Sequence, residues 1–528
     1  MKRKLRLPVV VSVLVLAACA AGVCSVSASG GKDRARAERA LKEGEFVEAE
    51  RLYRELVVKD AHDEQARLGL GLALLKQRKN QDAYDQAARV LAADPTDARA
   101  HALLGSALLN SGDFRLSVEE FRTALSFKDD EAMAVAGLAM VDFYENRLPA
   151  SLAGLRRAAF IDPNEPDYVF NLGQVAARYE RYAEAANAYE QFLRVAPRTD
   201  EDRRARIRGL IDFLRYLGTQ TDLLSVGGPE RVEIPFELSN NRPVIRVRVN
   251  GSKEEMRFVI DTGAGMCVIS TKSAEKLGLR PVARGGLARA VGGPGRFEIV
   301  YGFLQSLHIG DARIDRVPVY IREFFNVQEP VDGYIGLAVL GKFLSTVDYG
   351  GAKLTLLRES ARERETAAAP APGVVELPIR TTSSGFWSGE VNLEGLEKPA
   401  NFIVDTGASI SVVSAALYSQ AGLERFRQPG RINVYGAAGL AQDIEMLLLP
   451  RIVLGSTHAR QNVYAAVLDM DPINETAGFE QTGIVGGNIL RYYRVTFDFA
   501  RGLVRLEPLA APAPEGEQKT QPVITSQS

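Results

Sequence analysis

The sequence is poor in the residues that build disulfide frameworks and zinc clusters. Its 528 residues include only 3 cysteines and 4 histidines. Cys19 and Cys24 lie in the first thirty residues, which leaves Cys267 alone in the rest of the chain. A disulfide framework needs paired cysteines, and a structural zinc site needs four Cys or His ligands close together. We therefore expect no disulfide framework, no metal site and no cofactor.

Net charge and long apolar segments are also lacking. The 65 basic and 66 acidic side chains leave a formal net charge of −1, so the composition does not indicate nucleic acid as a partner. No segment after the leader is apolar over the roughly 18 residues that a membrane-spanning helix needs. The length and the 46% content of hydrophobic residues predict several globular domains.

The first thirty residues have the features of an export signal. Basic residues between Lys2 and Arg6 precede a short apolar segment, Val9–Ala18, which is too short to span a bilayer. The following Leu-Ala-Ala-Cys resembles the bacterial lipobox, which implies lipidation of Cys19. The alternative is an ordinary signal peptide cut after Ala28. We expect export across the cytoplasmic membrane, with a lipid anchor in the periplasm or cell envelope, or otherwise secretion.

Residues 33–218 show a helical pattern that repeats every 34 residues. Small or turn-forming residues recur at this interval, and so do larger side chains. The units therefore follow one another without insertions or deletions. The recurring sets are Ala61, Pro95, Asp129, Pro163 and Pro197; Gly71, Gly105, Ala139 and Gly173; Ala49, Ala83, Ser117, Ser151 and Ala185; and Tyr53, Ala87, Phe121, Leu155 and Tyr189.

This period resembles the tetratricopeptide repeat (TPR), in which small residues let paired helices approach closely. We expect four full units, a partial unit at the start and a capping helix over residues 201–218. Such an array presents a groove for a peptide or protein partner. The alternative is a spacer or a stabilising cap.

The C-terminal half contains the same strand-like plan twice. Phe258–Ala264 reads Phe-Val-Ile-Asp-Thr-Gly-Ala, and Phe402–Ala408 reads Phe-Ile-Val-Asp-Thr-Gly-Ala. Each motif is followed by an apolar turn ending in glycine, at Gly336 and at Gly486. Apolar, β-branched segments broken by glycine predict a β-rich duplicated domain.

The paired Asp-Thr-Gly motifs resemble those of the pepsin and retropepsin superfamily of aspartic peptidases, over about residues 230–508. The resemblance implies an all-β bilobal domain in which Asp261 and Asp405 are the catalytic pair. Two carboxyls held close together share one proton, so one can act as base while the other acts as acid; aspartic proteases are the standard example. The alternative is a duplicated β-domain without chemistry.

The residues beside the aspartates have roles implied by the same resemblance. Thr262 and Thr406 are expected to form hydrogen bonds across the lobe interface. Gly263 and Gly407 let the backbone approach the carboxyls, and Gly336 and Gly486 support the catalytic loops from beneath. Alanine follows each motif, where many pepsin-like enzymes have Ser or Thr. Without that hydroxyl donor we expect an activity optimum nearer neutral pH than in gastric-type enzymes.

Two glycine-rich segments are candidates for flaps that close on an extended peptide. Gly292 and Gly293 belong to the first lobe, and Tyr435 and Gly436 to the second. Both segments are also compatible with ordinary turns. Cys267 lies beside apolar residues without a histidine motif, so we expect a packing residue rather than a nucleophile.

These patterns predict an all-α tetratricopeptide solenoid followed by an all-β bilobal pepsin/retropepsin-like domain. The expected boundaries are 1–30 for the leader, 33–218 for the repeats, 219–231 for a linker, 232–357 for lobe 1, 358–373 for the inter-lobe linker, 374–508 for lobe 2 and 509–528 for a disordered tail.

The leading hypothesis for function is an aspartic endopeptidase that cleaves polypeptides, with the repeats docking a substrate or partner protein. One alternative is a catalytically inactive scaffold that binds peptides or proteins in the repeat groove. Another is an enzyme whose cleft is closed by its own repeat domain or linker.

Overall fold

A computed structural model describes residues 31–293, 295–325, 330–361, 373–455, 458–510 and 524–525. The leader, including Cys19, lies outside these residues, as do Pro294 and most of the expected inter-lobe linker and tail. The described chain forms two compact units. The first extends to Leu138 and includes Ala196–Asp200, and the second comprises Ala139–Val195 and Glu201 onward.

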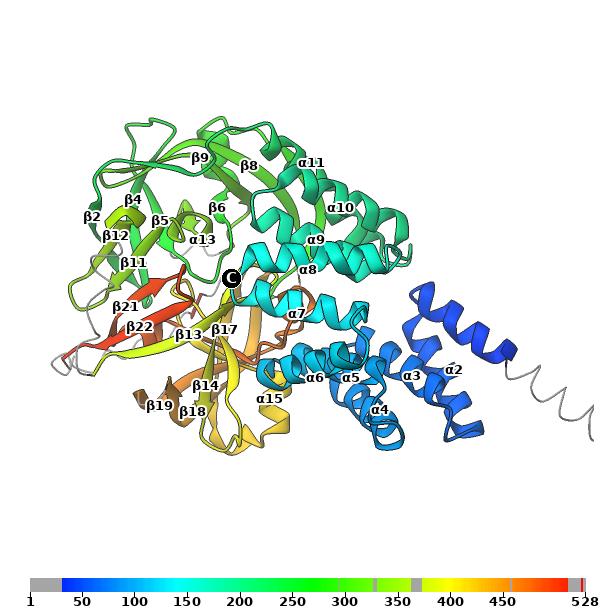
Figure 1. The fold of residues 1–528 in the computed structure, drawn as a ribbon. Coiled ribbons are helices and arrows are strands. Elements are labelled where there is room, and N and C mark those ends of the chain that lie inside the picture. The colour runs from blue at the N-terminus through cyan, green and yellow to red at the C-terminus, as the bar shows by residue number, and fades with distance from the viewer. Residues whose placement is uncertain are drawn as a thin grey trace, which may run out of the picture. The chain divides into compact units, whose positions relative to one another are not determined.

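The N-terminal region is an array of antiparallel helix pairs (Figure 1, blue to green-cyan). Residues 31–42 are helical, and with the next helix they form a pair where a partial unit was expected. The helices that follow are α2 (Phe46–Lys59), α3 (Glu64–Lys76), α4 (Asn80–Ala93), α5 (Ala98–Asn110), α6 (Phe114–Phe127), α7 (Ala132–Tyr144), α8 (Leu148–Ile161), α9 (Pro166–Arg178), α10 (Tyr182–Val195) and α11 (Glu201–Gly218).

The sequence period is reproduced by the helix starts, because α3, α5, α7 and α9 each begin 34 residues after the last. The repeated glycines lie where helices touch. A Cβ at Gly71 would lie 2.5 Å from Leu103 Cδ2, and one at Gly105 would lie 2.8 Å from Phe121 Cδ1. Both distances are below normal contact, so a glycine at these positions lets Leu103 and Phe121 pack closely against the helix.

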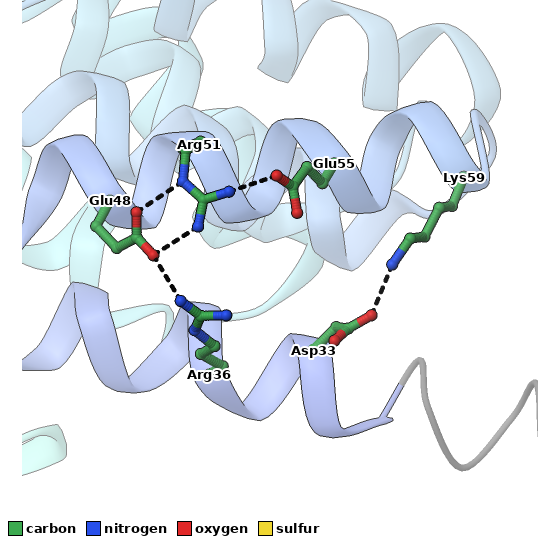
Figure 2. Close-up of polar contacts among 6 residues, drawn as sticks. All are labelled: Asp33, Arg36, Glu48, Arg51, Glu55 and Lys59. Atoms are coloured by element: carbon green, nitrogen blue, oxygen red, sulfur yellow. Dashed lines mark hydrogen bonds and ion pairs between the residues drawn. The ribbon is translucent and has the colours of Figure 1, made fainter.

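Ion pairs join the first two helices on their exposed side, as Figure 2 shows. Glu48 accepts from Arg51 at 2.7 Å and from Arg36 at 3.1 Å, and Arg51 also pairs with Glu55. Lys59 reaches Asp33 at 2.6 Å. Exposed pairs contribute little individually, so packing of the buried faces remains the main stabilising term for this helix pair.

The C-terminal region is β-rich, with short helices between strands. The first lobe contains β1 (Ser225–Gly227), β2 (Arg231–Pro235), β3 (Glu237–Ser239), β4 (Arg242–Val249), β5 (Met256–Ile260), β6 (Cys267–Ser270), α12 (Thr271–Lys276), β7 (Ala283–Arg289), β8 (Arg296–Ile309), β9 (Ala312–Arg322), β10 (Gly333–Ile335), α13 (Leu337–Leu340), β11 (Phe343–Asp348) and β12 (Lys353–Arg358).

The second lobe repeats this order. It contains β13 (Val375–Thr381), β14 (Trp387–Leu393), β15 (Ala400–Val404), β16 (Ser411–Ser414), α15 (Ala415–Gln420), η1 (Leu423–Phe426), β17 (Arg427–Gly436), β18 (Gly439–Leu454), β19 (His458–Leu468), α16 (Asp471–Ala477), β20 (Gly483–Val485), α17 (Gly487–Leu490), β21 (Tyr493–Asp498) and β22 (Leu503–Pro508); β23 (Ile524–Thr525) pairs with β17.

The two lobes meet in a shared sheet. Strand β11 of lobe 1 pairs antiparallel with β21 of lobe 2, with Thr346 opposite Thr496. Their hydroxyl oxygens lie 2.9 Å apart. The pseudo-twofold axis that relates the two lobes therefore passes between these equivalent threonines. Residues 219–231, expected as a linker, contain β1, which pairs with β9 of lobe 1. This segment is therefore partly built into the lobe-1 sheet.

Candidate active site

Each Asp-Thr-Gly motif begins where a buried central strand ends. Asp261 directly follows strand β5 and Asp405 directly follows β15, and the residues of both strands are mostly apolar and mostly buried. A parallel neighbour holds each loop: the backbone N–H of Asp261 donates to Ile335 O at 3.0 Å, and that of Asp405 donates to Val485 O at 3.0 Å. The duplicated sequence therefore produces two equivalent loops.

The two carboxyls face each other across the lobe interface. Asp261 is 1% exposed and Asp405 is fully buried. A Cβ at Gly263 would lie 2.4 Å from Cγ of Asp405, and a Cβ at Gly407 would lie 2.6 Å from Cγ of Asp261. Any side chain at either glycine would collide with the carboxyl of the opposite lobe, which is why these positions require glycine.

Hydrogen bonds of the two threonines join the two loops. Thr262 Oγ1 donates to Val404 O at 2.7 Å, and Thr406 Oγ1 donates to Ile260 O at 2.6 Å. Each hydroxyl also accepts from the backbone N–H of the other threonine, at 3.1 and 3.2 Å. This symmetrical set of four buried bonds fixes the distance between the lobes at the site.

Burial makes ionisation of this pair unfavourable. It raises the pKa of Asp261 well above its ordinary value, and the neighbouring Asp405 raises it further. Burial also raises the pKa of Asp405, although backbone donors such as Gly407 N–H oppose the effect. Asp405 Oδ2 has no hydrogen-bond donor among the described residues, and a proton carried by Asp261 would satisfy it. The pair is therefore suited to hold one proton between two carboxyls.

Comparison with known families agrees with this geometry. Residues 245–339 and 389–489 match the aspartyl protease family, and residues 40–107 and 98–131 match tetratricopeptide repeats. The chain carries an aspartyl protease domain behind tetratricopeptide repeats. The predicted family resemblance and fold class are confirmed, and the repeats indicate protein partners.

Individual relatives cover only part of the chain. The BBSome complex member BBS4 of Bos taurus is 23% identical over 161 residues, which are 30% of this chain and 31% of that protein. The corresponding Caenorhabditis elegans protein is 29% identical over 104 residues, 20% and 22% of the two chains. A solved TPR protein of Thermus thermophilus is 17% identical over 34% of this chain and 98% of its own, with a TM-score of 0.30.

The turns at Gly336 and Gly486, which were expected to support the Asp-Thr-Gly loops, make close backbone contacts. A Cβ at Gly336 would lie 2.5 Å from Met266 O, and one at Gly486 would lie 2.5 Å from Ile410 O. Gly336 N–H donates to Cys267 Sγ at 3.3 Å, and Gly486 N–H donates to Ser411 Oγ at 3.1 Å. Cys267 is thus the buried counterpart of a lobe-2 serine. Burial raises its pKa to about 12, which does not suit a nucleophile.

Both glycine-rich segments lie at the tips of β-hairpins, formed by β7 with β8 and by β17 with β18. The two tips touch, since Gly436 N–H donates to Gly292 O at 3.0 Å. A Cβ at Gly293 would lie 2.8 Å from the backbone of Ala438. Val291 is 1% exposed and packs with lobe-2 residues. We name these hairpins, which remain candidates for flaps, flap 1 (residues 283–309) and flap 2 (residues 427–454).

Helix α11 packs directly on flap 1. The Phe213 ring stacks on Tyr301 with centroids 4.3 Å apart, and Arg206 Nη1 donates to Leu287 O at 2.9 Å. A Cβ at Gly209 would lie 2.1 Å from Arg284 O. The β7–β8 register shifts between Arg284 and Leu287, so an irregularity in the hairpin coincides with the helix contact. No sequence pattern indicated that the capping helix of the repeats would support a flap.

Two arginines of lobe 1, one half-buried and one buried, were also not anticipated near the aspartate pair. Arg322 ends β9, and its positive charge opposes the rise in the pKa of Asp261. Arg242 begins β4 and is 1% exposed. Burial raises the pKa of Tyr334, which lies near both arginines, to about 12. The equivalent lobe-2 position is Ile484, which has no phenol. An arginine at a strand end carries no sequence signal for burial.

Proposed function

We propose that this protein is an aspartic endopeptidase that binds its polypeptide substrate beneath the two flaps. The observation that carries the proposal is the pair Asp261 and Asp405, buried face to face and suited to share one proton. Supporting it are the cross-lobe threonine bonds and the family match of both lobes.

In this mechanism a water molecule lies between the carboxyls. The ionised carboxylate removes a proton from the water as its oxygen attacks the scissile carbonyl carbon, and the protonated carboxyl donates its proton to the carbonyl oxygen. The tetrahedral intermediate then collapses. The C–N bond breaks, the nitrogen takes a proton from the carboxyl that received it, and the other carboxyl recovers its own. One water is consumed for each bond cleaved.

Hydrolysis of an extended peptide library tests the proposal. We expect cleavage by the purified protein and by Asp311→Asn, a control that changes an exposed carboxylate. Asp261→Asn and Asp405→Asn should lose at least about 1,000-fold in rate, because either change removes one of the two proton-carrying groups. A statine-type transition-state mimic should inhibit the wild type. Unchanged activity of both site variants would contradict the mechanism, and peptide binding without cleavage would favour the inactive scaffold.

We also propose that the repeats dock a partner protein or the substrate, and that the chain is exported. The first thirty residues support export, and Cys19 would carry the lipid if the lipobox is used. No helix in the described part of the chain is long and apolar enough to cross a membrane. Metabolic labelling with a fatty-acid analogue, comparing wild type with Cys19→Ala, tests the anchor. Label on both proteins or on neither would contradict it.

A further inference from the structure

Arg178, the last residue of α9, differs from the other arginines around it. Arg156 forms a 2.7 Å ion pair with Glu184, and Arg181 lies 5.8 Å from the Tyr179 ring centroid. In the part of the chain that the structure describes, the Arg178 guanidinium has no hydrogen bond, ion pair or aromatic contact. Burial lowers its pKa. The side chain of Arg178 is half-buried, so its guanidinium is open to a ligand, and partial burial strengthens its attraction to an anion.

The position of Arg178 connects it to the protease site. Its Nη1 atom lies 3.5 Å from a Cβ built at Gly385, in the lobe-2 loop between β13 and β14. This loop meets lobe 1 at Gly265, whose Cβ would lie 2.8 Å from Ser384 O. Gly265 is the fourth residue after Asp261. Arg178 therefore lies beside the seam between the lobes, a short distance from the catalytic pair.

An extended peptide can connect these positions. The chain from Asp261 to Gly265 spans at most about 14 Å, and an extended strand rises about 3.3 Å per residue. A substrate residue within about five positions of the scissile bond would thus reach the guanidinium. This reach assumes that the substrate follows the seam between the lobes, as the proposed function requires.

The equivalent position on the other side of the lobe interface has different polar contacts. There Asn241 of lobe 1 meets lobe 2 by donating to Ser409 O at 3.1 Å, and Ser409 is the fourth residue after Asp405. The nearby cation, Arg491, already donates to Asn241 Oδ1 at 3.0 Å. Among the described residues, an unpaired cation therefore lies at one end of the seam, so the two directions along a bound peptide are not equivalent.

We propose that Arg178 is a specificity-determining residue that binds a carboxylate of the peptide substrate on one side of the scissile bond. The inference rests on the proposed endopeptidase function. The carboxylate is either an Asp or Glu side chain or the free C-terminus of a short peptide, since a guanidinium recognises the same planar group in both.

Matched peptides test this specificity. A cleaved parent peptide is varied between Glu and Gln at each of the five positions nearest the scissile bond, on both sides, and with a free or amidated C-terminus. We expect the wild type to prefer the carboxylate at one position by about tenfold in kcat/KM, mainly through KM. Arg178→Met should remove this preference and leave cleavage of the Gln peptide within about twofold. Arg178→Glu should instead favour Lys at that position.

Arg181→Met is the matched control, because Arg181 is an exposed arginine three residues further along the chain. It should retain the full preference. Thermal unfolding reports folding of each variant, and Arg178→Met should unfold near the wild-type temperature because no hydrogen bond or ion pair of a described residue is lost. Equal cleavage of Glu and Gln peptides by the wild type, or a preference retained by Arg178→Met, would overturn the inference.

Failure of the proposed function gives a different result. If the wild type cleaves no peptide, fluorescence anisotropy with labelled Glu and Gln peptides still measures the affinity of the protein for each peptide. Tighter binding of the carboxylate peptides that is lost in Arg178→Met would support the role of Arg178 while contradicting peptidase activity. Equal binding of both peptides would overturn the Arg178 inference as well.

Discussion

At the scale of single residues, the two aspartates differ in the donors that reach them. Asp405 Oδ1 accepts from the backbone N–H groups of Gly407 at 2.7 Å and Ala408 at 3.2 Å. Asp261 Oδ1 accepts from Gly263 N–H at 2.9 Å. Because N–H donors stabilise the ionised form, we infer that the shared proton resides mainly on Asp261.

Replacing Asp261 by Asn should change how stability depends on pH. The pKa values of both aspartates are raised in the folded protein, so folding favours the protonated form. That contribution is fully present below the unfolded pKa of about 4 and is lost as pH rises through the folded values, by up to about 1.4 kcal/mol per pH unit and titrating group. Denaturant unfolding between pH 4 and 8 should therefore show a smaller decline for Asp261→Asn than for the wild type.

The control for this measurement is Glu397→Gln, which changes an exposed carboxylate. Its pH profile should follow that of the wild type. A profile for Asp261→Asn that declines as steeply as the wild type would contradict a raised pKa in the pair.

The same raised pKa values predict the pH dependence of activity. Neither lobe has a hydroxyl residue directly after Asp-Thr-Gly, since Ala264 and Ala408 occupy those positions. With burial unopposed by a hydroxyl donor, one proton should remain on the pair toward neutral pH. We expect the pH profile of kcat/KM to peak well above pH 3. A maximum below about pH 3 would contradict this prediction.

Thr262→Val should weaken the contact between the lobes. The change removes the hydroxyl that donates to Val404 O and accepts from Thr406 N–H, and leaves both groups buried without that partner. The expected loss is about 2–4 kcal/mol in the free energy of unfolding, together with reduced activity. Thr262→Ser keeps the hydroxyl and should recover most of the loss. Equal stability of the Val and Ser variants would show that the hydroxyl contributes little.

At the scale of elements, α11 belongs both to the repeat array and to the support of flap 1. Its Phe213 and Leu217 are buried with Tyr301 and Phe303 of the β8 strand. The helix begins at Glu201, where the chain passes from the first compact unit into the second. The β7–β8 hairpin is thereby packed against the last helix of the repeat array.

Gly209→Val should therefore affect the protease although it alters a repeat helix. The new Cβ would lie 2.1 Å from Arg284 O, so the helix must move away from β7. We expect a loss of about 1–3 kcal/mol in stability and a higher KM, because flap 1 loses its support. Gly218→Ala is the control, since its Cβ would lie an ordinary 3.7 Å from Tyr182 Cβ. Equal KM values for both variants would contradict a role of α11 in positioning the flap.

At the scale of the whole molecule, the division between the two compact units falls within the repeat helices. The second unit contains the lobes and also the helices from Ala139 onward, apart from the short segment before α11. Side chains from the repeats reach the lobes within this unit: the rings of Tyr144 and Phe479 lie 5.1 Å apart. The last repeat helices and the protease lobes thus belong to one compact unit.

A fragment containing only residues 219–528 should consequently fold poorly. It lacks α11, so Tyr301 and Phe303, which are 3% and 6% exposed, would face water. We expect a lower unfolding temperature and strong binding of a hydrophobic dye. A fragment over residues 139–528 retains α8–α11 and should behave like the full chain in both measurements. Equal unfolding temperatures for the two fragments would contradict this dependence.

The amino-acid sequence by itself determined the features that repeat. The 34-residue period follows from local requirements, since each helix pair needs a small residue at its crossing point. The duplicated Asp-Thr-Gly motifs similarly predicted two equivalent loops, because the same residues form the same strand and turn in each lobe. Both patterns can be recognised because the same local requirement recurs in every unit.

Only the tertiary structure decided which distant segments meet. It brings α11 against flap 1, buries Arg242 at the start of β4, and places Arg178 beside Gly385 of lobe 2. None of these contacts has a counterpart in a repeated unit. Each arises from elements that are far apart in the chain. Burial and the partners of a charge are set by such contacts, so they leave no periodic pattern in the sequence.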